Sequence, residues 1–327
     1  MQKSSPVGTC AQQLSLLNCR ILNVVSDNSS PTRVWSERGE WRTLLVVLSV
    51  YGLTALTVAR NEVLTPWLAV PFLAVLGAWH LSMQHEVLHG HPFKNQFLND
   101  FIGGIPVTLW IPYLAFKKDH HDHHLSDLTN PALDNESYYV TQEQWDKAGK
   151  IRRAAWTANR TILFRMFVWT IVSTITYVLS VLKRAVRNEK SDRLAVALHI
   201  IGVAFVVYLV SLSSMPLWQF ALGTVYGGRI LNAIRPFPEH KYQSGVETTT
   251  AMIMAGPFFS LLMLNNNLHV AHHDEPWVPW YRVNALARRV NAVERAREAG
   301  LLYEGGYAEV FRKFSFKPVD SPVRERN

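Results

Sequence analysis

Residues 67–91 read WLAVPFLAVLGAWHLSMQHEVLHGH, an apolar run that ends in a group of histidines. The apolar part, from Trp67 to Met83, is long enough to cross a membrane as a helix, and a membrane helix tolerates its Pro71. His85 and His89 are four residues apart, so they lie on one face of a helix with about 5–6 Å between their Cβ atoms. Two imidazoles in this arrangement can bind one metal ion, which indicates a metal site at the end of a membrane helix.

Two further histidine clusters follow later in the chain. Residues 120–124 read HHDHH and residues 269–273 read HVAHH, and with residues 85–91 these windows hold ten of the 13 histidines. In H-x-x-H-H the first and last histidines are four apart and the middle one is three from the first, so one helical turn presents three imidazoles. About eight histidines in such patterns are too many for one metal and suit two metals with positions left open for oxygen.

The candidate ligands are the histidines that these spacings place on shared helix faces: His85, His89, His120, His123, His124, His269, His272 and His273. His91 and His121 are additional candidates, but each points away from the face of its neighbour. His80 and His199 stand alone inside apolar runs, where we expect packed residues and not ligands. Imidazole suits iron, zinc and copper alike, so spacing alone does not select the metal.

Polar residues beside the clusters are candidate partners of the ligands. A carboxylate commonly accepts the second ring N–H of a metal-binding histidine and fixes its tautomer. The carboxylates next to these histidines are Glu86, Asp119, Asp122, Glu239 and Asp274. Three asparagines at positions 265–267 precede the third cluster, and one of them is expected to hydrogen-bond to a metal-bound water, without the sequence selecting which one.

The apolar runs predict four membrane-spanning helices in two hairpins. Residues 43–59 and 67–83 form the first hairpin, and residues 194–213 and 217–234 form the second. A fifth run, residues 166–182, would place the second and third histidine clusters on opposite faces if it also crossed. Residues 183–193, which follow it, contain five Lys and Arg and so resemble a cytoplasmic loop. We therefore predict that residues 166–182 lie along the cytoplasmic interface.

The predicted fold is an all-α integral membrane protein with a cytoplasmic helical cap that carries a histidine-rich di-metal site. Residues 1–40 are expected to form a mobile cytoplasmic tail, residues 41–290 the membrane domain and residues 291–327 a cytoplasmic C-terminal tail. Both termini and every histidine cluster fall on the cytoplasmic face of a multi-pass protein. The formal charge of +8 arises from basic residues that flank the apolar runs, which favours contact with lipid over binding of nucleic acid.

The order H-x-x-x-H, H-x-x-H-H, H-x-x-H-H between apolar runs resembles the membrane fatty acid desaturase superfamily. The local sequences HExxHG at 85–90 and NLHxxHHxxP at 267–276 are also similar to this superfamily and to carotenoid ketolases and hydroxylases, and the likeness covers roughly residues 40–290. The resemblance implies two iron ions, O2 as co-substrate and no catalytic side chain beyond the metal ligands. It also implies one more ligand after the last span, where Glu239 and His240 match the expected Glu-His pair.

The resemblance implies an oxidoreductase that introduces a double bond into a fatty acyl or lipid substrate, in a membrane such as the bacterial inner membrane. Alternatives are hydroxylation or ketolation of a hydrocarbon or carotenoid, and desaturation of a small amino-acid-like metabolite. A membrane haem or metal-binding protein without enzymatic activity would carry its histidines at mid-bilayer, whereas these clusters lie at the ends of apolar runs. The only cysteines are Cys10 and Cys19, so we expect a separate ferredoxin- or cytochrome-type electron donor.

Overall fold

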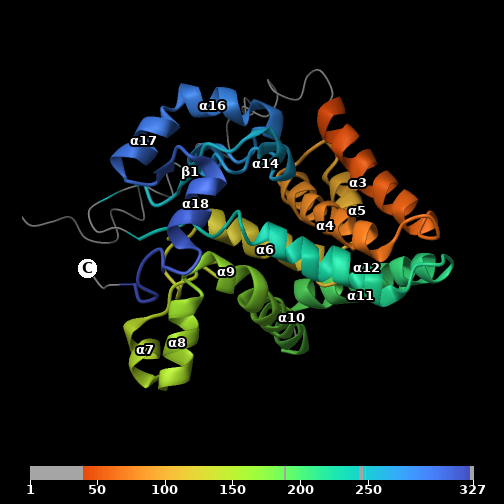
Figure 1. The fold of residues 1–327 in the computed structure, drawn as a ribbon, viewed down its shortest axis with the longest axis horizontal. Helices are drawn as coiled ribbons and strands as arrows, with labels where there is room; N and C mark the ends of the chain where they lie inside the picture. The colour runs from red at the N-terminus through yellow and green to blue at the C-terminus, as the bar shows by residue number, and fades with distance from the viewer. Residues whose placement is uncertain (1–39, 188, 243–245, 247, 325–327) are drawn as a thin grey trace, which may run out of the picture. The chain divides into compact units, whose positions relative to one another are not determined.

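The computed structural model describes residues 40–187, 189–242, 246 and 248–324, and within these ranges the chain is mostly helical (Figure 1). The expected N-terminal tail lies outside the described residues, except for Glu40. A short parallel strand pair joins β1 (Met252–Ile253) to β2 (Leu302–Tyr303). The predicted all-α class is confirmed.

Four helices are long and apolar enough to cross a membrane: α3 (Trp41–Ala59), α4 (Pro66–Leu88), the continuous helix Ile162–Val186 and α11 (Lys190–Ser211). The third of these consists of α9 (Ile162–Phe164), the π-helical segment η1 (Arg165–Trp169) and α10 (Thr170–Val186). Their outer faces are apolar, and large aliphatic side chains such as Leu48, Ile200 and Ile201 are more than half exposed. Such faces are favourable against lipid and costly against water.

The helix α4 packs closely against a segment that returns toward the histidines. This segment consists of α12 (Leu217–Ala221), the π-helical η2 (Leu222–Gly227) and α13 (Gly228–Asn232). A Cβ atom at Gly77 would lie 2.4 Å from the carbonyl oxygen of Thr224, so the two backbones meet where only glycine fits. Residues 217–234 were predicted as a span. In the structure these three segments run on without a break from Leu217 to Asn232, a helical stretch shorter than the four long helices and not among them.

The contacts of the helix Ile162–Val186 place both of its ends on the histidine side. Near its start, Ile162 packs in one core cluster with Phe237, three residues before His240. Near its end, Arg184 donates to Asp119, next to His120, at 3.0 Å. The turn after α3 and the turn after α11 contact each other, because the side chain of Asn61 donates to the carbonyl oxygen of Ser214 at 3.3 Å. These contacts support the interfacial position predicted for residues 166–182, although the helix is also long enough to cross, so that position stays a prediction.

The other helices are shorter, and two of them carry the remaining histidine clusters. Those before the helix Ile162–Val186 are α5 (Gln96–Gly103), α6 (Tyr113–His124), α7 (Gln142–Lys147) and α8 (Lys150–Ala158). Those after α13 are α14 (Pro257–Leu262), α15 (His269–Asp274), the 3-10 helix η3 (Trp280–Arg282), α16 (Val283–Arg289), α17 (Ala292–Glu298) and α18 (Gly306–Phe314).

The sequence predicts a C-terminal tail from residue 291, but residues 291–324 are folded against the elements that support the third histidine cluster. Strand β2 pairs with β1 in the register Met252↔Leu302 and Ile253↔Tyr303. Tyr307 and Val310 of α18 are buried in the same cluster as Ile253. The C-terminal segment is therefore part of the core that supports the third histidine cluster.

Candidate metal centre

Four segments far apart in the chain bring their histidines together. The end of α4 carries His85 and His89, the last turn of α6 carries the second cluster, and α15 carries the third. His240 follows α13 and forms an isolated bridge with Thr250. The site therefore depends on long-range packing, although each cluster is local.

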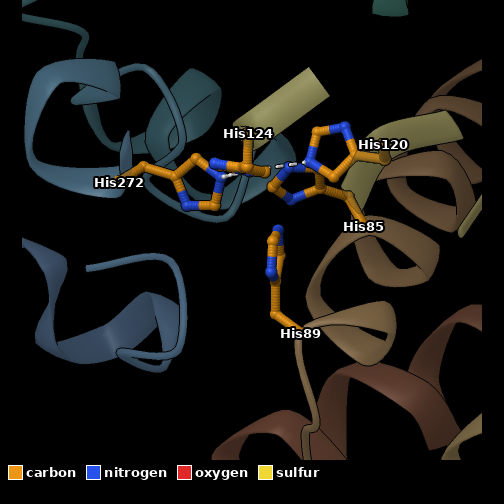
Figure 2. A group of neighbouring side chains, drawn as sticks. All are labelled: His85, His89, His120, His124 and His272. Carbon is orange, nitrogen blue, oxygen red and sulfur yellow. Dashed lines mark hydrogen bonds between the residues drawn. The ribbon is translucent and has the colours of Figure 1, made fainter. Parts of the chain in front are cut away.

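The nine histidines form two groups, in each of which one ring nitrogen per residue lies within 4.8 Å of the others. The first group, shown in Figure 2, consists of His85, His89, His120, His124 and His272. The second group consists of His123, His240, His269 and His273. Histidines four apart share a group, and the middle histidine of each H-x-x-H-H faces the other group. This division is the one that the helical spacing predicts for two metal ions.

The distances between the converging nitrogens fit metal ligation. Four pairs of Nε2 atoms lie 3.1–3.2 Å apart: His120–His124, His124–His272, His269–His273 and His240–His269. Two ligands at right angles on a metal at roughly 2.1 Å would lie about 3.0 Å apart. The Nε2 atom of His89 is buried without a hydrogen-bond partner among the described residues, which a ligated metal would remedy. The donor set therefore fits two histidine-bound metal ions.

Acceptors outside the clusters fix the tautomers of three histidines. The Nδ1 of His123 lies 2.9 and 3.0 Å from the two carboxylate oxygens of Asp134, and both side chains are buried. The Nδ1 of His120 lies 2.9 Å from Glu136. The Nδ1 of His269 lies 3.0 Å from the amide oxygen of Asn266. When Nδ1 donates, Nε2 is left with its lone pair toward the group, as a metal ligand requires.

The carboxylates predicted from the sequence as partners have other contacts, and this expectation needs correction. Glu86 accepts from the backbone N–H of Trp280, Asp119 binds Arg184, Asp274 binds Arg295, and Asp122 is exposed. Of this set, Glu239 comes nearest to a ligand candidate, with its carboxylate 3.6 Å from the Nε2 of His269.

The sequence pattern did not identify Asp134 and Glu136 as partners of the histidines. A detectable signal was present, because the turn sequence NPALDNE at 130–136 is separated by five residues from the second cluster and carries two acids two residues apart. Among the three asparagines left open, Asn266 is the one between the groups. Its amide nitrogen lies 3.4 Å from the Nε2 of His85, and its amide oxygen contacts His269.

The two additional histidine candidates lie outside both groups. His91 is hydrogen-bonded through both ring nitrogens, to Glu40 at 2.8 Å and to the carbonyl oxygen of Trp277 at 3.1 Å. Burial lowers the pKa of His91, but Glu86 and Glu40 more than offset this and raise it above its usual value. His121 is exposed. Neither ring is placed as a ligand of the two groups.

The isolated histidines of the apolar runs behave as expected. The Nε2 of His80 lies 2.9 Å from the carbonyl oxygen of Ile105, and the Nε2 of His199 lies 3.1 Å from that of Leu109. Each ring thus joins its helix to the same connecting segment before α6. Both are packing residues, outside the two histidine groups.

Burial favours the neutral form of most of the converging imidazoles. Desolvation, followed by the charges of neighbouring histidines, holds the pKa of His240, His269 and His272 well below the ordinary value, and lowers the pKa of His124 to about 2. Burial would raise the pKa of the Glu136 carboxyl, but the adjacent histidines lower it below its usual range. These four rings therefore offer free lone pairs at neutral pH. His123 differs, because Glu136 and Asp134 more than offset its burial and raise its pKa.

A cavity of about 480 Å³ adjoins the first histidine group. His85 and Asn266 line it from the metal side, and Trp110 and Met263 contribute apolar surface. Polar side chains of the helix Ile162–Val186 also line it: Ser173, Thr176, Tyr177, Ser180 and Arg184. A substrate in this cavity would lie against a histidine of the site.

Two largely buried histidine groups, the first of which includes the end of the long apolar helix α4, define a histidine-rich membrane metalloprotein. The family model described as Fatty acid desaturase matches residues 62–305, which include all nine histidines, and the chain belongs to this family. It is therefore a desaturase-family enzyme with a histidine-cluster metal site. Comparison with curated proteins finds no match to this chain.

Proposed function

We propose that the protein is an O2-dependent di-iron oxidoreductase that introduces a double bond into an aliphatic chain of a fatty acyl or lipid substrate. The observation that carries the proposal is the division of nine histidines into one group of five and one of four, next to a cavity. In the first group His85, His89, His120, His124 and His272 would bind one iron. In the second, His123, His240, His269 and His273 would bind the other.

The iron pair, when bound, supplies the activation of O2 and the removal of hydrogen from an unactivated C–H bond. Asp134 and Glu136 hold His123 and His120 in the tautomer that turns Nε2 toward the site. Asn266 contacts one histidine of each group and lines the cavity, so its amide is positioned to hydrogen-bond to a polar atom beside the histidines. Burial of the histidines excludes bulk water from this face.

The proposed orientation places the histidine groups in the cytoplasm. The basic segment between α10 and α11 begins beside the site, because Arg184 donates to Asp119 at 3.0 Å. Basic loops of membrane proteins are mostly cytoplasmic. Electrons would come from a separate ferredoxin- or cytochrome-type protein on the same side.

A small polar substrate, such as an amino-acid-like metabolite, is a second candidate. The cavity that adjoins His85 is lined by hydroxyl and amide groups as well as apolar side chains, including those of Ser173, Thr176, Ser180 and Asn232. The hydroxyls of Thr176 and Ser180 donate to backbone carbonyl oxygens of their own helix, at 2.9 and 2.7 Å, and their oxygens can still accept a hydrogen bond from a polar substrate.

The test is metal analysis of the full-length purified protein, combined with product analysis in a host with and without the gene. We expect close to two irons per chain and a new double bond in the lipid or polar metabolite fraction. His123→Ala and His272→Ala, one from each group, should each lower iron content and activity together. Full activity with zinc, or the finding of one haem, would refute the di-iron proposal.

A further inference from the structure

Among the described residues, one of the arginines that line the cavity beside His85 has no carboxylate partner. Three arginines and two acids line it: Arg184, Arg229, Arg235, Asp119 and Glu136. Arg184 binds Asp119 at 3.0 Å and Asp192 at 3.1 Å. Arg235 binds Glu239 at 3.1 Å. These two arginines therefore already have carboxylate partners.

Arg229 differs, because its partners within the described ranges are neutral. Its Nε donates to the hydroxyl of Thr174 at 3.1 Å, and one Nη donates to the hydroxyl of Ser173 at 2.9 Å. The guanidinium lies over the ring of Trp110, 4.4 Å from its centroid. Two of its five N–H donors are used in this way, which leaves three for a ligand.

A half-buried guanidinium without a counterion is a ready site for an anion. Arginine stays charged in proteins, and its planar fork matches a carboxylate or a phosphate in a bidentate arrangement. The contacts to Ser173 and Trp110 hold the fork on the wall of the cavity that His85 also lines. An anionic ligand would offset the desolvation of this charge.

Resting on the function proposed above, we propose that Arg229 binds an anionic group of the substrate, a carboxylate or a phosphate, and so positions the reacting carbon relative to His85. When one end of a substrate is held in a fixed position, only some of its C–H bonds can reach the histidine groups. The hydroxyls of Thr176 and Ser180 border the same cavity and offer further hydrogen bonds to a polar substrate. Arg229 is thus a specificity-determining residue for substrates that carry an anionic group.

The test measures binding of three probes of similar length to the iron-loaded full-length protein by calorimetry. The probes are hexanoate, hexyl phosphate and the neutral hexanamide. We expect one of the anions to bind about 10-fold or more tightly than hexanamide, and the preferred anion assigns the group as a carboxylate or a phosphate. Arg229→Gln should abolish this preference, whereas Arg229→Lys should keep part of it. The matched control is Arg193→Gln, an exposed arginine at the start of α11, which should bind as the wild type does.

Equal affinity of the wild type for all three probes, or absence of any binding, would overturn the proposal. A preference for anions that persists in Arg229→Gln would also overturn it. Should Arg229→Gln fail to fold, Arg229→Lys decides, because loss of the planar fork should weaken anion binding while the charge remains. Iron content is measured on the same samples. A wild type that holds two irons but shows no anion preference refutes the role of Arg229 alone, whereas absence of iron refutes the function proposed above.

Discussion

Replacing Asp134 by asparagine tests whether a residue outside the histidine clusters controls one of the two metal sites. The carboxylate lies 2.9 and 3.0 Å from the Nδ1 of His123, and the two side chains are 0% and 1% exposed. In Asp134→Asn the amide oxygen can still accept from Nδ1, but the negative charge that strengthens this bond is lost.

The expected cost follows from that contact. A hydrogen bond to a charged group contributes about 1.5–3 kcal/mol, which corresponds to a factor of about 10–150 in an equilibrium constant. Loss of such a partner of a metal-bound histidine usually lowers metal affinity about 10–100-fold. His123 belongs to the group of four histidines, so this group should weaken while the group of five keeps its metal.

The assay is iron content per chain during titration with a chelator. Asp134→Asn should release one of its two irons at a chelator concentration about 10–100-fold lower than the wild type needs. The matched control is Asp122→Asn, since Asp122 lies within the second cluster but is exposed. Simultaneous release of both irons from Asp134→Asn, or identical titrations of the two variants, would refute the assignment of Asp134.

His240→Ala should give an inactive, iron-poor protein that still inserts normally, because its ring lies in the second histidine group. His199→Ala, whose ring bonds to a backbone carbonyl oxygen, should keep its iron and activity, and equal iron in both variants would show that His240 is not a ligand. A reporter of cytoplasmic location should be active after Arg187 and inactive at Ser214, whereas an inactive Arg187 fusion would mean that residues 166–182 cross the membrane.

The grouping of the histidines follows from local sequence because helical spacing alone decides which rings share a face. His120 and His124 are four apart and share a group, whereas His123 faces the other group. No tertiary information is needed for this step. His240 belongs to no such spacing, and only the resemblance to desaturases indicated it.

The partners of the histidines could not be predicted from adjacency. Asp119 and Asp122 stand beside ligand candidates in the sequence, yet a residue next to a ligand on a helix points to a different face. The carboxylates of Asp134 and Glu136 contact the rings of His123 and His120 because the turn after α6 folds back over this helix. That path depends on tertiary packing.

The folded position of the C-terminal segment could not be predicted from the sequence for a similar reason. Its apolar residues are few and spaced along short helices, and they contain no long run. Tyr307 and Val310 become core residues only because β2 pairs with β1 and brings α18 onto the cap. A short amphipathic helix can be recognised as part of the core only when the surface opposite it is known.

The second and third clusters each contribute residues to both histidine groups, and this arrangement couples the positions of the two groups. In α6, His120 and His124 face one group and His123 faces the other. In α15 the assignment is reversed, because His269 and His273 join the second group and His272 joins the first. Each helix therefore joins the two metal positions through its own backbone, so their separation is set by two rigid helical turns. A shift of α6 or α15 would disturb both histidine groups together, so the packing against these helices is part of the site itself.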